Sequence, residues 1–184
     1  GQQTLDAAAQ ALARQALTDG EALRATQRAH DAGQAARDTC QDLCTIVREL
    51  FPAGTPQRAM LKVNGTMPKG ALAFLAAAKT LFDNALRVDR IASALAQYGY
   101  DQMALEQGRL QVALYQQALQ EQAAAQKAVT RATEEQRAAR AALEKWLKGY
   151  TTLAKIALRD RLDLLDNLGI PRQAVPPSEG TPPA

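Results

Sequence analysis

The chain has 184 residues and is 47% hydrophobic but only 4% aromatic, with 22 basic and 19 acidic residues and a net charge of +3. This length suits one domain with a core of moderate size. The abundance of Ala and Gln and the scarcity of aromatic residues argue against a sheet protein. Charges of both signs are interspersed, whereas nucleic-acid binders usually gather basic residues on one face. We therefore expect an all-α protein with no specific nucleic-acid partner.

No apolar run approaches the ~20 residues that a transmembrane helix needs. We expect a soluble protein without a transmembrane segment, and the cytoplasm is the slightly favoured compartment. Because the chain starts at Gly1 rather than Met, we leave open a processed start and a removed signal peptide.

The first expected helix covers residues 4–51, with Thr4 as its N-cap. Pro52 and Gly54 end it. Apolar and small residues recur in it about every 3.5 residues, which is the spacing of a coiled-coil seam. The phase of this seam passes Gly20 and Gly33, so one continuous helix is expected. Its members are Leu5, Ala9, Leu12, Ala16, Asp19, Leu23, Thr26, His30, Gly33, Ala36, Cys40, Cys44, Val47 and Phe51.

Residues 52–70 hold most of the non-helical signal. Asn64-Gly65 is the strongest two-residue hairpin pattern, so we expect a small hairpin or an ordered loop at one end of the bundle. Long loops inside compact domains are often functional, and the alternative is a plain connection that seals the bundle end. The candidate contact residues of this loop are Lys62, Val63, Asn64 and Gly65.

The next expected helix covers residues 71–98, with a kink near Val88-Asp89. Gly99 is expected as its C-cap glycine, and Asp101 as the N-cap of the helix that follows.

The stretch from 101 to 158 contains no proline and only two glycines, Gly108 and Gly149. Nearly all its other residues are strong helix formers, and one helix there would be roughly 85 Å long. A hairpin at Gly149 is the alternative. Its seam is expected to contain Leu114, Ala118, Ala125, Ala128, Ala132, Ala139, Leu143, Trp146, Tyr150, Leu153 and Ala157.

A short helix over 161–168 should follow, capped by Asp160 and ended by Gly169, with Ile170 packing back on Leu165. Residues 171–184 contain five prolines and almost nothing to bury, which predicts a disordered tail.

Together these elements predict an elongated antiparallel helical bundle or coiled coil over residues 1–170, with three long helices and a short C-terminal one. Small residues dominate 16–36 and 118–142, and small side chains let helix axes approach closely. This alanine-rich stalk should bury little area per residue and open first. A thicker core elsewhere is expected to contain Leu43, Leu50, Phe51, Phe74, Phe82, Trp146 and Leu147.

Cys40 and Cys44 lie one helical turn apart and are the metal candidates, because two thiolates at this spacing could hold a soft metal. A tetrahedral zinc site needs four ligands, and the one histidine, His30, is about 15 Å away along the axis. Their seam position favours two small buried side chains instead. No cofactor is expected.

His30 shares the seam with Asp19 and Thr26, and these three make a polar interval in the apolar stripe. Polar seam residues often fix register or oligomeric state. We expect a partly buried, hydrogen-bonded histidine and include His30 among the interaction candidates.

Two stretches resemble a loose set of uncharacterised bacterial helical-bundle proteins. One is Leu95-Ala96-Gln97-Tyr98-Gly99-Tyr100, and the other runs from Trp146 to Tyr150 and on to Ile170. The resemblance covers the C-terminal half. It implies a helix that continues through Gly149 and implies no activity, substrate or partner.

The pattern as a whole indicates a non-enzymatic structural or protein–protein interaction module, with a protein partner or self-association. No phosphate-binding loop, haem motif or nucleophile elbow is present. The alternatives are a small-ligand or metal-binding bundle centred on Cys40 and Cys44 near Trp146, and a weak membrane-surface or nucleic-acid binder.

Overall fold

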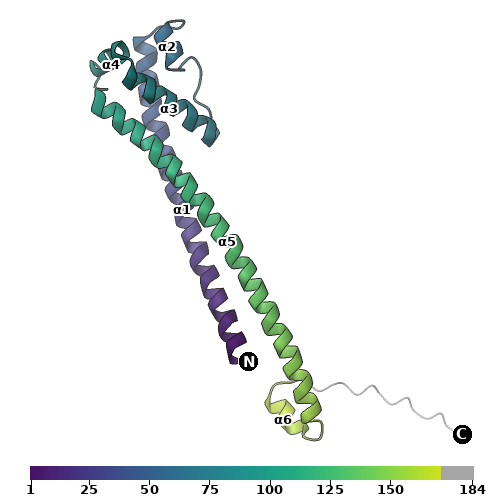
Figure 1. Cartoon of the computed structure of the whole chain (residues 1–184). Helices are drawn as coiled ribbons and strands as arrows, with labels where there is room; N and C mark the ends of the chain where they lie inside the picture. Colours follow the sequence, from purple (N-terminus) through teal and green to yellow (C-terminus); the bar gives the residue numbers. More distant parts are fainter. Residues whose placement is uncertain (171–184) are drawn as a thin grey trace, which may run out of the picture. The chain divides into compact units, whose positions relative to one another are not determined.

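The computed structural model describes residues 1–170, and every regular element in that range is a helix (Figure 1). The all-α class is therefore confirmed. The two longest expected helices are also present, and they pack together. The tail expected over 171–184 lies outside the described residues. The helices are α1 (Gln2–Leu50), α2 (Pro56–Met60), α3 (Ala71–Arg87), α4 (Asp89–Ala96), α5 (Gln102–Ala157) and α6 (Leu162–Asn167).

The chain forms two compact units. Unit 1 combines residues 1–15 with the described residues from 131 onward, and unit 2 holds residues 16–130. Helices α1 and α5 contribute to both units, while α2, α3 and α4 belong to unit 2. The single elongated bundle expected over residues 1–170 stays a prediction.

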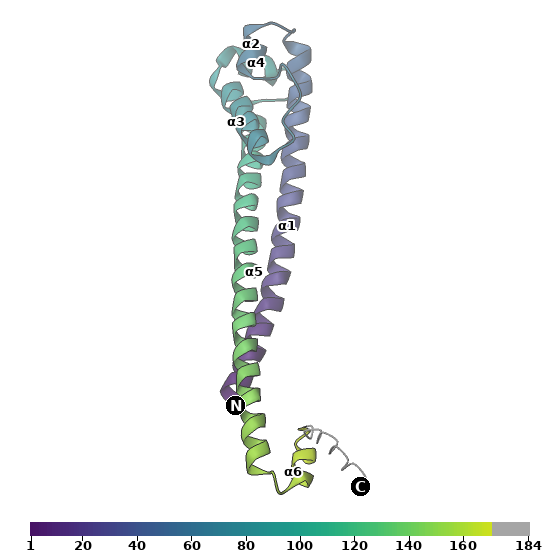
Figure 2. The same ribbon diagram turned by 90° about the vertical axis from the view of Figure 1, so that its right-hand side faces the viewer.

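The large core lies in unit 2, where α2, α3 and α4 gather beside the end of α1 and the start of α5 (Figure 2). Two glycines of the long helices allow close contact there. Gly108 of α5 lies against the ring of Phe82, and a Cβ at Gly33 of α1 would lie 2.8 Å from the Tyr115 ring. The largest fully buried side chains are Phe74, Phe82, Leu43, Leu61, Leu81, Ile91, Leu95 and Leu105.

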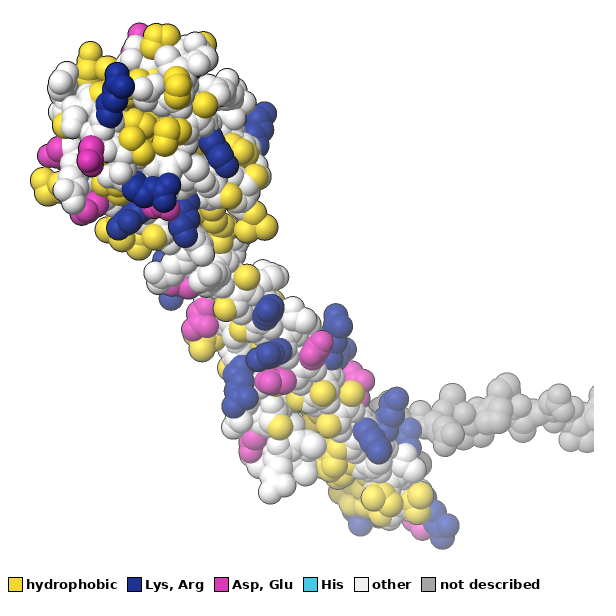
Figure 3. All heavy atoms as spheres, turned by 45° about the horizontal axis from the view of Figure 1, so that its top comes forward, with side chains coloured by type: hydrophobic (Ala, Val, Ile, Leu, Met, Phe, Trp, Pro, Cys, Tyr) yellow, Lys and Arg dark blue, Asp and Glu magenta, His cyan; other side chains and the backbone are white. Residues whose placement is uncertain are grey.

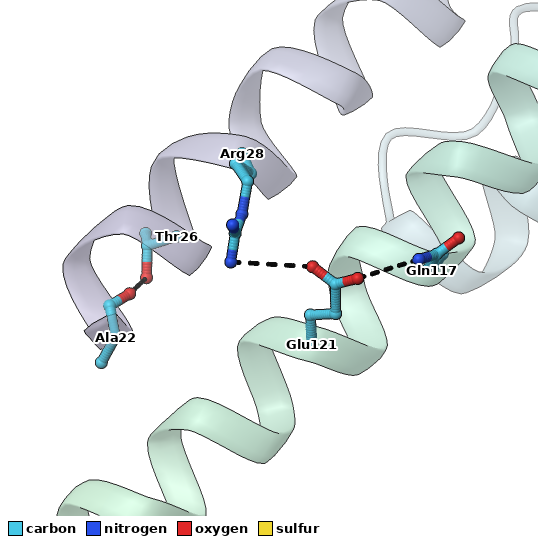
Figure 4. Close-up of polar contacts among 5 residues, drawn as sticks. All are labelled: Ala22, Thr26, Arg28, Gln117 and Glu121. Carbon is cyan, nitrogen blue, oxygen red and sulfur yellow. Dashed lines mark hydrogen bonds and ion pairs between the residues drawn. The ribbon is translucent and has the colours of Figure 1, made fainter. Parts of the chain in front are cut away.

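Beyond this core, α1 and α5 of unit 2 pack as an antiparallel pair through small side chains. Ala25 and Ala29 are 2% and 4% exposed. At the edge of the seam, Arg28 of α1 pairs with Glu121 of α5 at 3.7 Å (Figure 4). Beside it, the Gln122 amide donates to the Thr26 hydroxyl at 3.3 Å. The expected close packing of small residues is thus confirmed in this unit.

The phase of the α1 seam differs from the prediction before Gly33. Ala11 of unit 1 and Ala25 of unit 2 are buried, whereas Leu5, Leu12 and Leu23 are more than half exposed. The buried stripe lies one residue to the N-terminal side of the predicted one, which is a rotation of about 100° around the helix. From Gly33 to Val47 the predicted and observed stripes agree.

The α5 seam is predicted well from Ala118 to Leu143, but not at its ends. Tyr115 is buried in place of Leu114. Trp146, expected in the core, is 39% exposed, and Leu147 is exposed as well. In unit 1 Trp146 lies against Gly1, which is the first residue of the sequence.

Of the two expectations for residues 52–70, a small hairpin or an ordered loop, the hairpin is absent, because this range forms the short helix α2 and no strand. Thr55 caps α2, Pro56 starts it, and the fixed φ of proline suits that position. Lys62 then adopts a left-handed φ of 56°. The Lys62 and Val63 amides donate to Ala59 and Arg58, so a helix C-cap forms where Asn64-Gly65 suggested a hairpin.

The helix expected over 71–98 is divided into α3 and α4 at Val88, where the backbone is extended. This is the position of the expected kink. Gly99 takes a φ of 84° as the C-cap glycine. The Asp101 carboxylate accepts the Ala104 amide at 2.8 Å, as expected of the α5 N-cap.

Two other cap predictions are wrong. Helix α1 begins at Gln2, and the Thr4 hydroxyl donates to the Gly1 carbonyl instead of capping the helix. The N-cap of α6 is Arg161 rather than Asp160. At the other end of α6, Gly169 has the expected left-handed φ of 66°, and Leu165 and Ile170 are both buried.

Helix α5 runs without a break through Gly149, and α1 runs through Gly20 and Gly33, as expected. Among the described residues, no helix combines the length and apolar character needed to cross a bilayer.

Candidate functional site

Unit 2 contains a hollow of about 370 Å³ between α1 and the loop that follows α2, here called the Arg37–Arg48 groove. Its α1 side is a single stripe, because residues three, four and seven apart share a helix face. Its loop side is formed by Thr66 and Met67, and Phe74 of α3 completes it. The lining residues are Arg37, Gln41, Cys44, Thr45, Arg48, Thr66, Met67 and Phe74.

Two arginines of α1 hold the loop beside the helix. The Arg37 guanidinium donates to the Pro68 carbonyl at 3.3 Å and to the Lys69 carbonyl at 2.9 Å. Arg48 donates to the Gly65 carbonyl at 2.9 Å. Because α1 and the loop meet at both ends of the groove, each guanidinium has a fixed position.

Aromatic and sulfur-containing side chains form the apolar part of the groove. The Arg37 guanidinium lies 4.4 Å from the centroid of the Phe74 ring, within cation–π distance. Phe74 is almost fully buried and packs at a tilt against Tyr115, with 6.1 Å between ring centroids. Cys44 is buried at the base of the groove, and Met67 is half-buried.

Both cysteines are buried and reduced. Burial raises the pKa of Cys40 from 9.0 to about 12, the Cys44 thiol beside it adds to the rise, and Arg37 opposes it. Burial also raises the pKa of Cys44, with Arg48 acting in the opposite direction. Since the thiolate is the nucleophile and the metal ligand, both positions favour the inert thiol form.

The described residues contain no cluster of three or more His, Cys, Asp or Glu side chains that could hold a metal ion. The two thiols therefore have no third ligand of these types beside them. Trp146, expected near the thiols, belongs to unit 1, whereas Cys40 and Cys44 belong to unit 2.

The sequence-predicted contact residues are not gathered into one site. His30 is exposed, not partly buried, because the observed phase of α1 rotates it out of the seam. Val63 is 1% exposed and belongs to the core, which removes its side chain from any contact surface. Lys62, Asn64 and Gly65 are exposed, and the Gly65 carbonyl accepts from Arg48.

Unit 1 carries a second hollow, of about 470 Å³, on the C-terminal part of α5. We name it the Gly149 hollow, because no heavy atom lies within 4 Å of a Cβ placed on that glycine. The rings of Trp146 and Tyr150 are stacked along one side, with centroids 5.3 Å apart. The remaining lining residues are Ala142, Lys145 and Leu153.

Sequence reasoning did not identify the arginines of the groove. Arg37 and Arg48 were visible as basic residues in helical phase with Cys44, on one stripe of α1. Their role depends on carbonyl groups of residues 65–69, and no residue pattern shows where a loop places its carbonyls.

Comparison with family models, with curated proteins and with solved structures finds no match.

Proposed function

We propose that this protein is a non-enzymatic protein–protein interaction module that associates with a second copy of itself. The proposal is based on the Gly149 hollow and on the exposed apolar residues around it. Large exposed apolar patches on folded proteins commonly mark interaction sites.

The surface around the hollow carries both a cavity and protruding side chains. Leu153 is 69% exposed at its edge, and Ile156 is exposed one turn further along α5. The absence of a side chain at Gly149 leaves room for an apolar side chain of another helix, as in knobs-into-holes packing. In a twofold dimer the same patch is used by both copies. Leu153 of each copy would then enter the Gly149 hollow of the other.

The aromatic residues beside the Gly149 hollow also support this surface as the dimer interface. Trp and Tyr are enriched in protein interfaces because they supply large rigid contact area. The stacked pair of Trp146 and Tyr150 has this character, and both side chains are about two-fifths exposed.

The test is the mass in solution, measured by light scattering joined to small-angle X-ray scattering over a range of concentrations. The mass of the unaltered protein should rise from 19.8 kDa toward twice that value. Gly149→Gln should keep the protein monomeric, because the new side chain fills the hollow from a position that is open to solvent.

Gly20→Gln is the matched control. Gly20 is also a helical glycine with nothing within 4 Å of its Cβ position, so this variant should associate like the unaltered protein. A monomer at every concentration would overturn the proposal. Undiminished association of Gly149→Gln would also overturn it, because the hollow would then not be the interface.

A further inference from the structure

We infer that the Arg37–Arg48 groove binds a small organic anion that joins a carboxylate or phosphate group to an apolar body. The inference is independent of self-association, since the groove is built entirely from residues of unit 2.

The charge around the groove favours an anion. Loop residues 52–70 contain Arg58, Lys62 and Lys69 and no acidic residue. The acidic residues of this part of α1 are Asp38, Asp42 and Glu49. None of the three lines the groove, but each lies three, four or seven residues from the groove residue Thr45 and therefore borders the groove on that side. On the face shown in Figure 3, Lys and Arg side chains, together with some Asp and Glu side chains, border hydrophobic ones where α2, α3 and α4 gather.

The two arginines are held in place by the loop carbonyls before any ligand binds. A guanidinium has five N–H donors in a planar fork that matches carboxylate and phosphate oxygens. Arg37 uses donors for the Pro68 and Lys69 carbonyls, and Arg48 uses one for Gly65. The other donors can serve a ligand. Groups fixed before binding lose less entropy when the ligand arrives.

Apolar side chains of the groove would favour a ligand that has an apolar body. Met67 is half-buried and supplies the exposed apolar surface of the groove, whereas Phe74 and Cys44 line it with side chains that are only 1% exposed. An inorganic ion would leave this surface in contact with water, whereas a ring or short hydrocarbon chain would cover it. The volume of about 370 Å³ lies within the range of small-molecule pockets.

The competing explanation is that Arg37 and Arg48 only fasten the loop to α1. That role predicts lower stability of arginine variants but no saturable binding. A direct measurement of ligand binding, which includes a variant that keeps both arginines, separates the two explanations.

Titration calorimetry with phenyl phosphate and with benzoate as probes, joined to amide chemical shifts, makes this test. Saturable binding should shift the amide signals of Thr45 and Thr66. Arg48→Gln should weaken binding at least tenfold. Met67→Glu should also weaken it, because it places a negative charge in the groove while both arginines keep their carbonyl partners. The probe that binds more tightly identifies the anionic group.

Arg28→Gln is the matched control, because it removes the same charge from an exposed position of α1 outside the groove. It should bind phenyl phosphate as the unaltered protein does, and inorganic phosphate should bind at least tenfold more weakly than phenyl phosphate. The inference would be overturned by the absence of saturable binding to both probes. Equal losses in Arg28→Gln and Arg48→Gln would overturn it too, since they indicate only general charge attraction.

Discussion

Cys40 and Cys44 show how burial sets the chemistry of single residues in this protein. Both side chains lie on the buried stripe of α1, and Cys40 is 0% exposed. Removing a thiol from water disfavours its ionised form. The pKa of Cys40 accordingly rises to about 12. We therefore interpret the pair as core side chains.

The raised thiol pKa predicts a loss of stability at alkaline pH. The folded pKa of Cys40 lies above the unfolded value near 9.0. The stabilising contribution of the neutral thiol is thus complete below pH 9 and is lost as pH rises toward 12. For one such group the free energy of unfolding falls by up to about 1.4 kcal/mol per pH unit in this window. Urea unfolding from pH 7 to pH 11 measures it.

Cys40→Ala serves as the reference, because other groups of the protein also titrate in this range. Its free energy of unfolding should be lower at neutral pH, owing to the lost side-chain volume, but should decline less steeply above pH 9. Equal slopes for the two proteins would contradict the assignment of Cys40 as a buried neutral thiol.

At the scale of the elements, two helical glycines allow close contacts between helices. Gly108 lets α5 approach the Phe82 ring of α3, and Gly33 lets α1 approach Tyr115 of α5. Helical glycines cost about 0.5–1 kcal/mol relative to alanine. Because glycine lowers helix propensity, we attribute Gly33 and Gly108 to the close packing that they allow.

The contrast between Gly108 and Gly20 gives a prediction. Gly20→Ala should raise the free energy of unfolding by about 0.5–1 kcal/mol, because its Cβ meets open space. Gly108→Ala should lower the free energy of unfolding despite the same gain in helix propensity, since overpacking costs about 1–3 kcal/mol. Chemical denaturation of both variants makes the comparison. Stabilisation by Gly108→Ala would show that Phe82 moves away at little cost.

At the scale of the whole molecule, the packing of the described residues is uneven. The thick core of unit 2 contains the phenylalanines and most of the buried leucine and isoleucine side chains. The α1–α5 pair of the same unit is joined mainly by alanines such as Ala25, Ala29 and Ala118. Burial of a methyl group stabilises far less than burial of a leucine or phenylalanine side chain.

This difference predicts an order of opening along α1 within unit 2. Amide hydrogen exchange should be slowest in residues 36–47, which pack in the core. It should be faster in residues 16–30, where the helix is held by small side chains. Mass spectrometry of peptides from the two ranges measures the rates. Uniform protection along α1 would show that the pair opens only with global unfolding.

The exposed leucines show where sequence reasoning reaches its limit. A stripe through Leu5, Leu12 and Leu23 has the larger side chains, so hydrophobicity favours it as the buried seam. The structure buries a neighbouring stripe that contains Ala11 and Ala25. Both stripes have helical spacing, and the choice between them depends on how closely α5 approaches. One helix pattern does not contain that information.

The candidate sites were predictable to different degrees. Burial of the two cysteines followed from their seam position, because the phase of α1 is well defined from Gly33 onward. The Arg37–Arg48 groove was not predictable, since it depends on where the carbonyl groups of residues 65–69 lie, and the sequence left both a hairpin and an ordered loop open for that range. The Gly149 hollow was only partly predictable. The sequence shows a glycine within a helix, but it does not show that Trp146 and Tyr150 stack beside that glycine.

The sequence by itself determined the helical class, the continuity of α1 and α5 through their glycines, and several of the caps. These properties depend on interactions within a few residues, through propensity, local hydrogen bonds and helical spacing. Only the tertiary structure decided which stripe of α1 faces α5, how residues 52–70 fold, and which arginines meet the loop carbonyls. Each of these depends on contacts between residues far apart in the chain, whose energies decide between local arrangements of similar stability.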